Sequence, residues 1–394
     1  MWRGFKTSYR SVIRVPFGPQ HPALKEPENF TFEIDGDIVI NVKPRIGYNH
    51  RGIEKAFEQR TYIQNLYLAE RICGICSDAH TTCYAQAIED LLGVEAPPRA
   101  KYIRVIIAEL ERIHSHSLWL GIAAHEIGFD TLFMYYWRDR EAVMNLLEMI
   151  SGNRVHYAMN TIGGVRRDIR SEMIPKIKKG LDFLEGRMKR YMEIVKQDLT
   201  ISKRTEGVGI LKQKDAMDLC AVGPTLRASG IKNDVRADDP YAAYDEIPFN
   251  VITYDGCDVL SRILVRSEEI FESIRIIRYA LDHIPDGMTR IRVPMAVPPG
   301  EAVSRVEAPR GELIHYARSD GTTKPERYKV RSPTLGNIPA LCKMLLGCHI
   351  ADIPIILAGI DPCFACMDRI TFIDVRKDEK WVWSMQQLRR HTKR

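Results

Sequence analysis

Alternation of apolar and polar residues predicts strands near both ends of the chain. Residues 30–34 and 38–42 are short apolar runs on either side of an Asp-Gly-Asp triplet, a pattern typical of a β-hairpin. Residues 289–330 combine short apolar runs with turn residues and predict a second region of strands and turns. Both regions are short, so they leave most of the chain to helices.

Between these regions, apolar residues recur at the spacing of amphipathic helices. A stretch rich in Gly, Pro and Asp at residues 220–256 interrupts this spacing and predicts an extended surface loop. The pattern therefore predicts a helix-dominated α+β fold, with a central bundle of long helices and β elements at both ends. The predicted helices cover most of residues 49–92 and then 100–122, 131–150, 170–201, 257–281 and 332–348.

Length and charge bound the organisation of the chain. Its 394 residues suffice for one large domain. We expect that domain over residues 1–369 and a C-terminal extension over residues 370–394. The net charge of +6 is concentrated in the extension, which holds seven Lys/Arg and three Asp/Glu, so the nearly neutral body gives no reason to expect a nucleic-acid partner.

The apolar runs are too short for a membrane span, which needs roughly eighteen residues or more. No apolar stretch follows the basic N-terminus either. We therefore expect neither a transmembrane segment nor a signal peptide.

Nine cysteines in a long chain without a signal peptide indicate metal or catalytic thiols rather than disulfides. Four of them form two CxxC pairs, Cys73/Cys76 and Cys363/Cys366. The i,i+3 spacing predicts two thiols on one helix face, where they can share a soft metal. The remaining five are predicted to be small buried hydrophobic residues: Cys83, Cys220, Cys257, Cys342 and Cys348.

The distance between the two pairs argues against a zinc ribbon. Zinc ribbons separate their pairs by roughly 15–20 residues, whereas 286 residues lie between Cys76 and Cys363. A structural zinc that joins the two ends of the chain, or an iron–sulfur cluster on the four thiols, remains compatible with the spacing.

The residues around the pairs carry a more specific signal. Residues 71–80 read RICGICSDAH and residues 361–369 read DPCFACMDR. Together with HRGIE at residues 50–54 and EAPRGE at residues 307–312, they resemble the signature motifs of nickel–iron hydrogenase large subunits. The resemblance runs from about residue 16 to residue 369, nearly the whole chain.

Further segments narrow the resemblance to one branch. GPQHPA at residues 18–23 resembles the start of the quinone-site subunit of respiratory complex I, which lacks the four cysteines. RIHSH at residues 112–116, Asn153-Arg154 and GGVRRD at residues 163–168 are similar to segments of the energy-converting, membrane-bound hydrogenases and formate hydrogenlyases.

One residue departs from the pattern of the periplasmic uptake enzymes. Arg369 replaces their histidine, which helps to hold a magnesium ion, so no magnesium site is expected here. Glu54 is either a remnant of such a site or part of a structural ion pair.

The resemblance implies a nickel ion held by four thiolates, soft donors that stabilise more than one oxidation state. Cys73 and Cys363 would be terminal ligands. Cys76 and Cys366 would bridge to an iron that carries carbon monoxide and cyanide.

Four other residues are predicted to serve this centre. Arg310 would offset its negative charge, or else pair with Glu307 or Glu312 at the surface. His80, at i+4 from Cys76, can hydrogen-bond a bridging sulfur or be a core histidine. Asp361 would bond Arg310 or cap a local turn. Glu26 would pass protons onward if its pKa is raised, or else be a solvated loop acid.

The resemblance also implies partners and a location. The chain has no third CxxC pair, so electrons would leave through a 4Fe–4S cluster in a small subunit. Other complex I-like hydrophilic and membrane subunits would couple the reaction to ion translocation, with ferredoxin or a formate or carbon monoxide dehydrogenase module as electron donor. The complex would lie on the cytoplasmic face of the membrane, with this chain as a peripheral subunit.

The resemblance predicts reversible proton reduction to H₂. It also implies that residues 370–394 are a propeptide, removed after Arg369 once nickel is bound; the alternative is a permanent surface strand and helix. Two alternatives remain open. One is a complex I-like or sulfur-reducing subunit of the same fold without a nickel–iron centre, and the other is a structural module with zinc on the four thiols.

Overall fold

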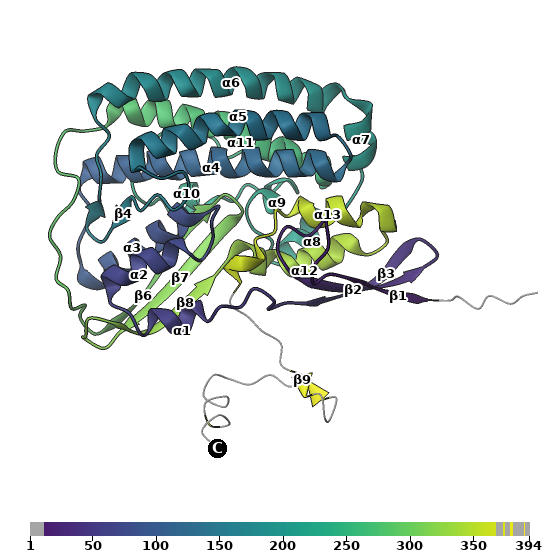
Figure 1. Ribbon diagram of the computed structural model, residues 1–394, viewed down its shortest axis with the longest axis horizontal. Helices are drawn as coiled ribbons and strands as arrows, with labels where there is room; N and C mark the ends of the chain where they lie inside the picture. Colours follow the sequence, from purple (N-terminus) through teal and green to yellow (C-terminus); the bar gives the residue numbers. More distant parts are fainter. Residues whose placement is uncertain (1–11, 368–372, 375–378, 381–389, 391–394) are drawn as a thin grey trace, which may run out of the picture.

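The computed structural model describes residues 12–367, 373–374, 379–380 and 390. Most of the predicted extension, including the proposed cleavage position after Arg369, lies outside the described residues. Inside them, the elements run from a small N-terminal sheet through a helical bundle to a second sheet and a group of short helices (Figure 1).

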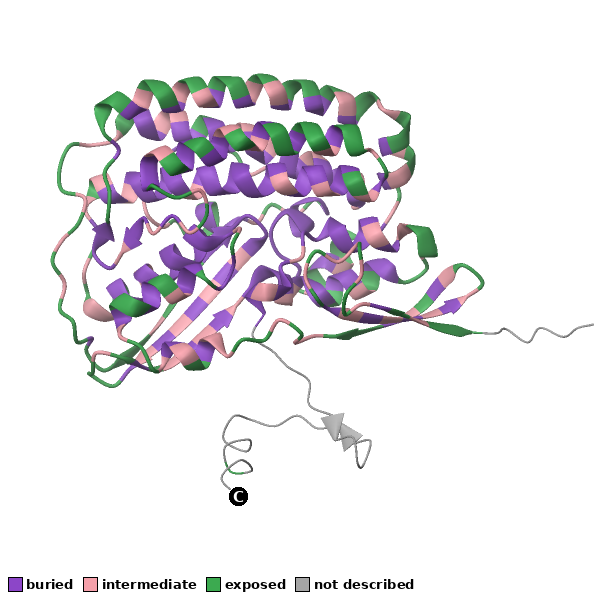
Figure 2. Ribbon diagram, viewed as in Figure 1, coloured by how far each residue is buried: buried purple, intermediate pink, exposed green. Residues whose placement is uncertain are grey.

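Four long helices pack side by side and form the bundle along one side of the molecule (Figure 1). The longest, α4, is buried around most of its circumference, as expected of a helix at the centre of a core (Figure 2). The predicted central bundle is therefore confirmed. Its members are α4 (Pro98–Glu126), α5 (Asp130–Ser151), α6 (Ile174–Gln197) and α11 (Val259–His283).

Two predicted helical stretches are divided in the structure. The stretch at residues 170–201 breaks at Asp198, whose carboxylate accepts hydrogen bonds from the backbone N–H groups of Thr200 and Ile201 and starts a new helix. The stretch at residues 49–92 forms three helices, because a capping box of Thr61 and Gln64 starts the second one. The resulting elements are η1 (Ser171–Met173), α7 (Leu199–Thr205), α1 (Ile53–Phe57), α2 (Tyr62–Glu70) and α3 (Ser77–Leu92).

Three-stranded antiparallel sheets occur near both ends of the chain, as predicted. In the second sheet every other residue of the central strand is buried, which places one face against α3 and α1 (Figures 1 and 2). The first sheet contains β1 (Ile13–Phe17), β2 (Asn29–Asp35) and β3 (Ile38–Arg45), and the second contains β6 (Gly300–Ala308), β7 (Gly311–Ser319) and β8 (Pro325–Arg331), each in chain order.

Residues 220–256 do not form the extended surface loop that their composition predicts. They include two short helices and buried charged side chains, among them Arg227, Asp234 and Arg236. These charges are buried because they pair with acids on α4, α11 and β6, which composition alone does not reveal. The two helices are α9 (Pro224–Arg227) and α10 (Val235–Asp238).

The last part of the body is a group of short helices beside the first sheet (Figure 1). Two β-bridged segments and α8 complete the described elements of the body. None of the described helices combines the length and apolar character that a bilayer crossing needs. The elements are β4 (Asn160–Thr161), β5 (Gly164–Val165), α8 (Gln213–Asp218), α12 (Pro333–Leu345), η2 (Ile350–Asp352), α13 (Ile353–Gly359) and η3 (Phe364–Cys366); β9 (Ile373–Asp374) and β10 (Glu379–Lys380) follow.

Candidate metal centre

The two CxxC pairs lie in turns, not on helix faces, so the predicted placement was wrong for both. Cys76 is the N-cap residue of α3, and Cys73 lies in the turn before it. Cys363 is the N-cap residue of the short 3₁₀-helix η3, and Cys366 is the last residue of that helix. The first turn wraps around a sulfur atom: the backbone N–H groups of Ile75 and Cys76 donate to Cys73 Sγ at 3.3 and 3.4 Å. Amides directed at a sulfur stabilise its thiolate form.

The fold brings all four thiols together in its interior. The Sγ–Sγ distances are 3.3 Å for Cys73–Cys363, 3.8 Å for Cys76–Cys366 and 2.9 Å for Cys363–Cys366. Each of the four residues is at most 3% exposed. A metal that binds four thiolates at about 2.3 Å in a tetrahedron holds the sulfurs about 3.8 Å apart. The Cys76–Cys366 distance equals that value, whereas the Cys73–Cys363 and Cys363–Cys366 distances are about 0.5 and 0.9 Å shorter, so a metal ion would have to spread the thiols apart by less than about 1 Å.

The thiols differ in how readily they ionise. Hydrogen bonds from the thiols of Cys363, Cys366 and Cys76 lower the pKa of Cys73 well below its usual value. The pKa of Cys366 is raised, first by its hydrogen bond with Cys363 and further by burial. A metal ion would replace the shared protons as the source of positive charge among the four sulfurs.

Arg51 joins the two cysteine turns. Its guanidinium donates to the backbone oxygens of Arg71 at 2.8 Å and Ile72 at 2.6 Å on one side, and of Ala365 at 2.9 Å on the other. The HRGIE motif drew attention to this segment, but no role for Arg51 could be predicted from it, because one of its partners lies 314 residues away. Arg51 therefore fixes the separation of the two turns.

Arg310 lies in the tight turn between β6 and β7 and points toward the second cysteine turn. Its Nη2 and Nε donate to the carboxylate and the backbone oxygen of Asp361, both at 2.8 Å. Burial alone would lower the pKa of Arg310, but Asp361 and the cysteine sulfurs raise it well above its usual value. Of the predicted alternatives, an ion pair with Glu307 or Glu312 does not form among the described residues, whereas the contact with Asp361 does.

A close approach of two glycines holds the Arg310 turn in place. A Cβ atom on Gly223 would lie 2.4 Å from both the backbone oxygen of Arg310 and the Cα of Gly311. Gly223 also has a φ of +68°, which side-chain-bearing residues rarely adopt. The loop before α9 can therefore press against this turn only because both positions lack a side chain.

Glu26 lies against the second cysteine turn. One carboxylate oxygen accepts the backbone N–H of Ala365 at 2.7 Å, and the other lies 3.8 Å from Cys363 Sγ. Burial raises the pKa of Glu26. Glu26 is therefore not the solvated loop acid of the alternative prediction. Its role in proton transfer stays a prediction.

Glu54 forms a structural ion pair. Lys329 Nζ lies 2.7 Å from one carboxylate oxygen, and the backbone N–H of Val330 donates to the other at 3.1 Å. These contacts agree with the second of the two interpretations given for this residue.

His80 lies on α3 next to the centre, as its spacing from Cys76 predicts. One of its ring nitrogens and the Sγ atoms of Cys76 and Cys366 all lie within 4.8 Å of one another. Burial lowers the pKa of His80 to about 4, so its imidazole is neutral. Its role toward a bridging sulfur stays a prediction.

Sequence reasoning missed Glu111, a buried acid of α4. Its carboxylate accepts the backbone N–H groups of Asp78 at 2.6 Å and Ala79 at 3.0 Å. It therefore caps the first turn of α3, which follows directly on Cys76. No signal in the sequence connects Glu111 with α3, because the cap comes from another helix.

None of the five single cysteines belongs to a described group of possible metal ligands, and the prediction that all are buried was partly wrong. Cys83 is buried, Cys220 is exposed, and Cys257, Cys342 and Cys348 are intermediate.

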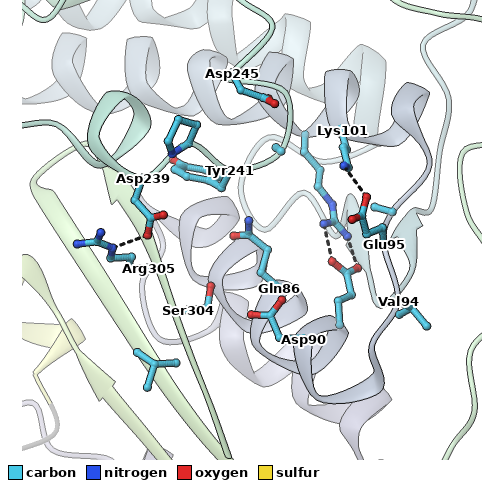
Figure 3. Close-up of a pocket in the computed structure, with 16 residues that line it drawn as sticks. Gln86, Asp90, Val94, Glu95, Lys101, Asp239, Tyr241, Asp245, Ser304 and Arg305 are labelled. Carbon is cyan, nitrogen blue, oxygen red and sulfur yellow. Dashed lines mark hydrogen bonds and ion pairs between the residues drawn. The ribbon is translucent and has the colours of Figure 1, made fainter.

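A larger cleft lies elsewhere, between α3, α4, the segment at residues 239–245 and β6 (Figure 3). It encloses about 480 Å³, and no cysteine lines it. Some of its charged groups are paired, as in Arg305–Asp239 and Lys101–Glu95, while Asp90 and Asp245 also line it. The residues that line the cleft include no cysteine, histidine or methionine, so the cysteine centre is the better candidate for a soft metal.

Comparison with known families agrees with the motifs. Residues 126–294 and 290–369 match the family described as "Respiratory-chain NADH dehydrogenase, 49 Kd subunit". Residues 51–122, which contain the first cysteine pair, match "Nickel-dependent hydrogenase".

Individual proteins show the same kinship. The chain is 41% identical to "Membrane-bound hydrogenase subunit alpha" of Pyrococcus furiosus, over 92% of this chain and 88% of that protein. It is 38% identical to "Formate hydrogenlyase subunit 5" of Escherichia coli, over 96% of this chain and 67% of that protein. A subunit of an archaeal membrane-bound sulfane sulfur reductase superposes with a TM-score of 0.87 at 32% identity, over 92% of this chain and all of that one.

These matches define a class of electron-transfer subunits built on one fold. The chain belongs to the family of nickel-dependent hydrogenase large subunits and complex I 49 kDa subunits, in its membrane-bound hydrogenase branch. The resemblance predicted from the motifs is thereby confirmed. Its relatives are parts of membrane complexes with several subunits.

Proposed function

We propose that the chain is the catalytic subunit of a membrane-bound hydrogenase complex and catalyses 2H⁺ + 2e⁻ ⇌ H₂. One observation carries the proposal. Four buried thiols from opposite ends of the chain meet within metal-binding distance, with the Arg310–Asp361 pair beside them. A chain that used the fold only as a docking platform would have no need of four soft donors around one point.

The proposed cofactor is a nickel ion with an iron that carries carbon monoxide and cyanide. The thiolates of Cys73, Cys76, Cys363 and Cys366 would hold this centre. When bound, this centre would supply the redox-active metal pair at which H₂ is split or formed. The nickel-dependent hydrogenase match over the first pair supports this assignment.

The protein would hold the centre and move protons. Arg310, anchored by Asp361, places a fixed positive charge beside the thiolates and stabilises their ionised form. Glu26 is in contact with Cys363 and has a raised pKa, so it can accept a proton at that sulfur and release it toward solvent. Glu26 is thus the proposed first proton acceptor beyond the cysteines.

The electrons would come from partner subunits. The five other cysteines are scattered along the chain and include an exposed one, so a cluster in this chain is not part of the proposal. We assign the electron relay to a small subunit with a 4Fe–4S cluster, and ion translocation to complex I-like subunits, at the cytoplasmic face of the membrane. Reduced ferredoxin, or a formate or carbon monoxide dehydrogenase module, would be the electron donor.

The similarity to the sulfane sulfur reductase subunit supports a second candidate, reduction of a sulfur compound by the same complex architecture. The two candidates differ in whether H₂ is a reactant. Isotope exchange between D₂ and water protons by the purified complex separates them, because it needs no electron donor.

Exchange activity in the complex, and its loss in a Cys366→Ser variant that still assembles with its partners, is the expected result. A Cys342→Ser variant, outside the centre, is the matched control. A complex that contains stoichiometric nickel but catalyses no exchange, and that reduces polysulfide instead, contradicts the hydrogenase proposal.

A further inference from the structure

A chain of three buried side chains leads away from the centre behind His80. His80 Nδ1 lies 3.1 Å from His315 Nε2, and His315 Nδ1 lies 2.6 Å from the hydroxyl oxygen of Tyr328. All three side chains are fully buried. Neither His315 nor Tyr328 belongs to the motifs that identified the centre.

The three residues come from elements that face each other. His80 lies on α3, and His315 and Tyr328 lie on the adjacent strands β7 and β8. On the buried face of β7, His315 lies between the apolar residues Leu313 and Ala317. A polar residue that breaks such a pattern needs a partner, and here the partners are each other.

Hydrogen-bond polarity decides where each proton lies. Among the described residues, the hydroxyl of Tyr328 has no hydrogen-bond partner other than His315, so its O–H must donate to His315 Nδ1 to avoid a buried unpaired donor. A neutral imidazole that accepts at Nδ1 carries its proton on Nε2. His315 Nε2–H then donates to His80 Nδ1.

The same rule applied to His80 puts its proton on Nε2. That nitrogen has no partner within the part of the chain that the structure describes. One ring nitrogen of His80 lies within 4.8 Å of the Sγ atoms of Cys76 and Cys366, and the ring forms no hydrogen bond to either sulfur in this structure. If each of these hydrogen bonds ran in the opposite direction, His80 would present the lone pair of Nε2, and not an N–H, beside the two thiolates. The O–H of Tyr328 would then have no acceptor.

We infer that Tyr328 and His315 are positioning residues that fix the tautomer of His80, so that His80 presents an N–H at Nε2, and not a lone pair, beside the sulfur pair of Cys76 and Cys366. Burial lowers the pKa of both histidines, in agreement with two neutral rings. A hydrogen bond to a ligand sulfur withdraws electron density from it and thereby tunes the metal. The effect on a metal rests on the proposed function, whereas the tautomer does not.

Packing holds the three hydrogen-bonded side chains in place. The ring of Phe57 stacks on Tyr328 with centroids 4.3 Å apart and planes 16° from parallel.

Tyr84, next to Tyr328, provides a matched control. Its ring is also buried, 5.5 Å from that of Tyr328, but its hydroxyl donates to the backbone oxygen of Tyr62 at 2.9 Å and takes no part in the chain.

The first test uses the full chain produced without nickel and labelled with ¹⁵N-histidine. Two-bond nitrogen–proton correlation spectra report which ring nitrogen carries the proton. His80→Gln and His315→Gln variants assign two of the eleven histidines. The inference expects both rings protonated at Nε2 only. A proton on Nδ1 of either ring, or on both nitrogens of His80, overturns it, and this measurement on the unaltered chain does not depend on any change at Tyr328.

The second test compares Tyr328→Phe with Tyr84→Phe. In the metal-free chain, Tyr328→Phe is expected to give a mixture of tautomers at His315, whereas Tyr84→Phe leaves the spectrum unchanged. In the mature complex, infrared bands of the proposed carbon monoxide and cyanide ligands should move to lower wavenumber in Tyr328→Phe alone. Equal shifts in both variants overturn the inference. Absence of such bands from every sample overturns the proposed cofactor but leaves the tautomer result standing.

Discussion

Glu26 shows how one side chain obtains a proposed function from its surroundings. Its carboxylate contacts a cysteine sulfur on one side and a backbone amide on the other, and burial raises its pKa. Glu28, two residues further on, is also buried, and burial raises its pKa to about 7. Proximity to the sulfur, rather than burial, therefore distinguishes Glu26.

We predict that Glu26→Gln lowers the rate of D₂–proton exchange by about 10²–10⁴-fold, because the amide cannot accept a proton from Cys363. The nickel content of the complex should stay unchanged, since glutamine can still accept the N–H of Ala365. Glu28→Gln serves as the control for a general disturbance of the loop. Equal losses in the two variants would show that Glu26 acts through loop structure.

Glu307 allows a prediction of pH dependence. It shares the Arg227 guanidinium with Glu269 and Asp234, and burial raises its pKa to about 7 in spite of that pairing. Between pH 4.5 and 7 the unfolded chain has released the Glu307 proton and the folded chain still holds it. The contribution of Glu307 to the free energy of unfolding therefore decreases as the pH rises through that window.

Glu307→Gln removes the titration. Relative to the unaltered chain, the free energy of unfolding of the variant should therefore rise by up to about 3 kcal/mol between pH 4.5 and 7. Denaturant titrations of the full chain at several pH values measure this difference, with Glu326→Gln at the exposed edge of β8 as control. A difference that stays constant over the window refutes the prediction.

At the scale of elements, the centre depends on turns that other elements hold in place. Arg51 joins the two cysteine turns, Glu111 caps α3 from α4, and Gly223 packs against the turn that carries Arg310. None of these contacts involves a sulfur atom. The geometry of the thiols is therefore built into the protein before any metal binds.

Gly223→Ala tests this at one contact. The added Cβ would lie 2.4 Å from backbone atoms of the Arg310 turn at a position with positive φ, so we expect a loss of more than about 2 kcal/mol in the free energy of unfolding. Gly230→Ala is the matched control, since its φ is also positive but its nearest contact is 3.6 Å. The control should lose only about 1 kcal/mol, and similar losses in both would mean that close packing at Gly223 contributes nothing.

The long helices and the two sheets were predictable because each has a local periodicity and local end signals. The division of residues 49–92 was missed because helical spacing continued across the turns at Thr61 and Cys73. The burial of residues 220–256 was missed because the partners of Arg227 and Arg236 lie on distant elements.

Within the site, the four cysteines, Arg310, Asp361, His80 and Glu26 carried recognisable motifs or positions. Arg51 lay in a motif but had no assigned contact, while Glu111, His315 and Tyr328 act through tertiary contacts alone. Residues of this second kind become visible only when the hydrogen bonds of the folded chain are traced.

At the scale of the whole molecule, the centre links the two ends of the folded body. The first thiol pair precedes the helical bundle and the second follows both the bundle and the second sheet. A metal on all four sulfurs would therefore close the chain across 286 residues.

We predict that metal loading slows backbone hydrogen exchange at residues 71–77 and 361–367, while exchange in the outer bundle helix α6 is unchanged. The thiolate–metal bonds restrain only the two turns, and α6 packs against the rest of the bundle without them. Hydrogen exchange with mass spectrometry on metal-free and mature chains measures this. Slower exchange throughout the bundle, or unchanged exchange at the two turns, would contradict a centre that acts as a local link.

The central claim, that the four thiols hold a nickel–iron centre, is tested most directly by the metal content of the mature chain purified with its partners. We expect about one nickel per chain and one iron beyond those of the partner's clusters, with nickel lost in Cys73→Ser and Cys363→Ser but kept in Cys342→Ser. One zinc per chain in place of nickel, or no metal that depends on Cys73 and Cys363, would contradict the account.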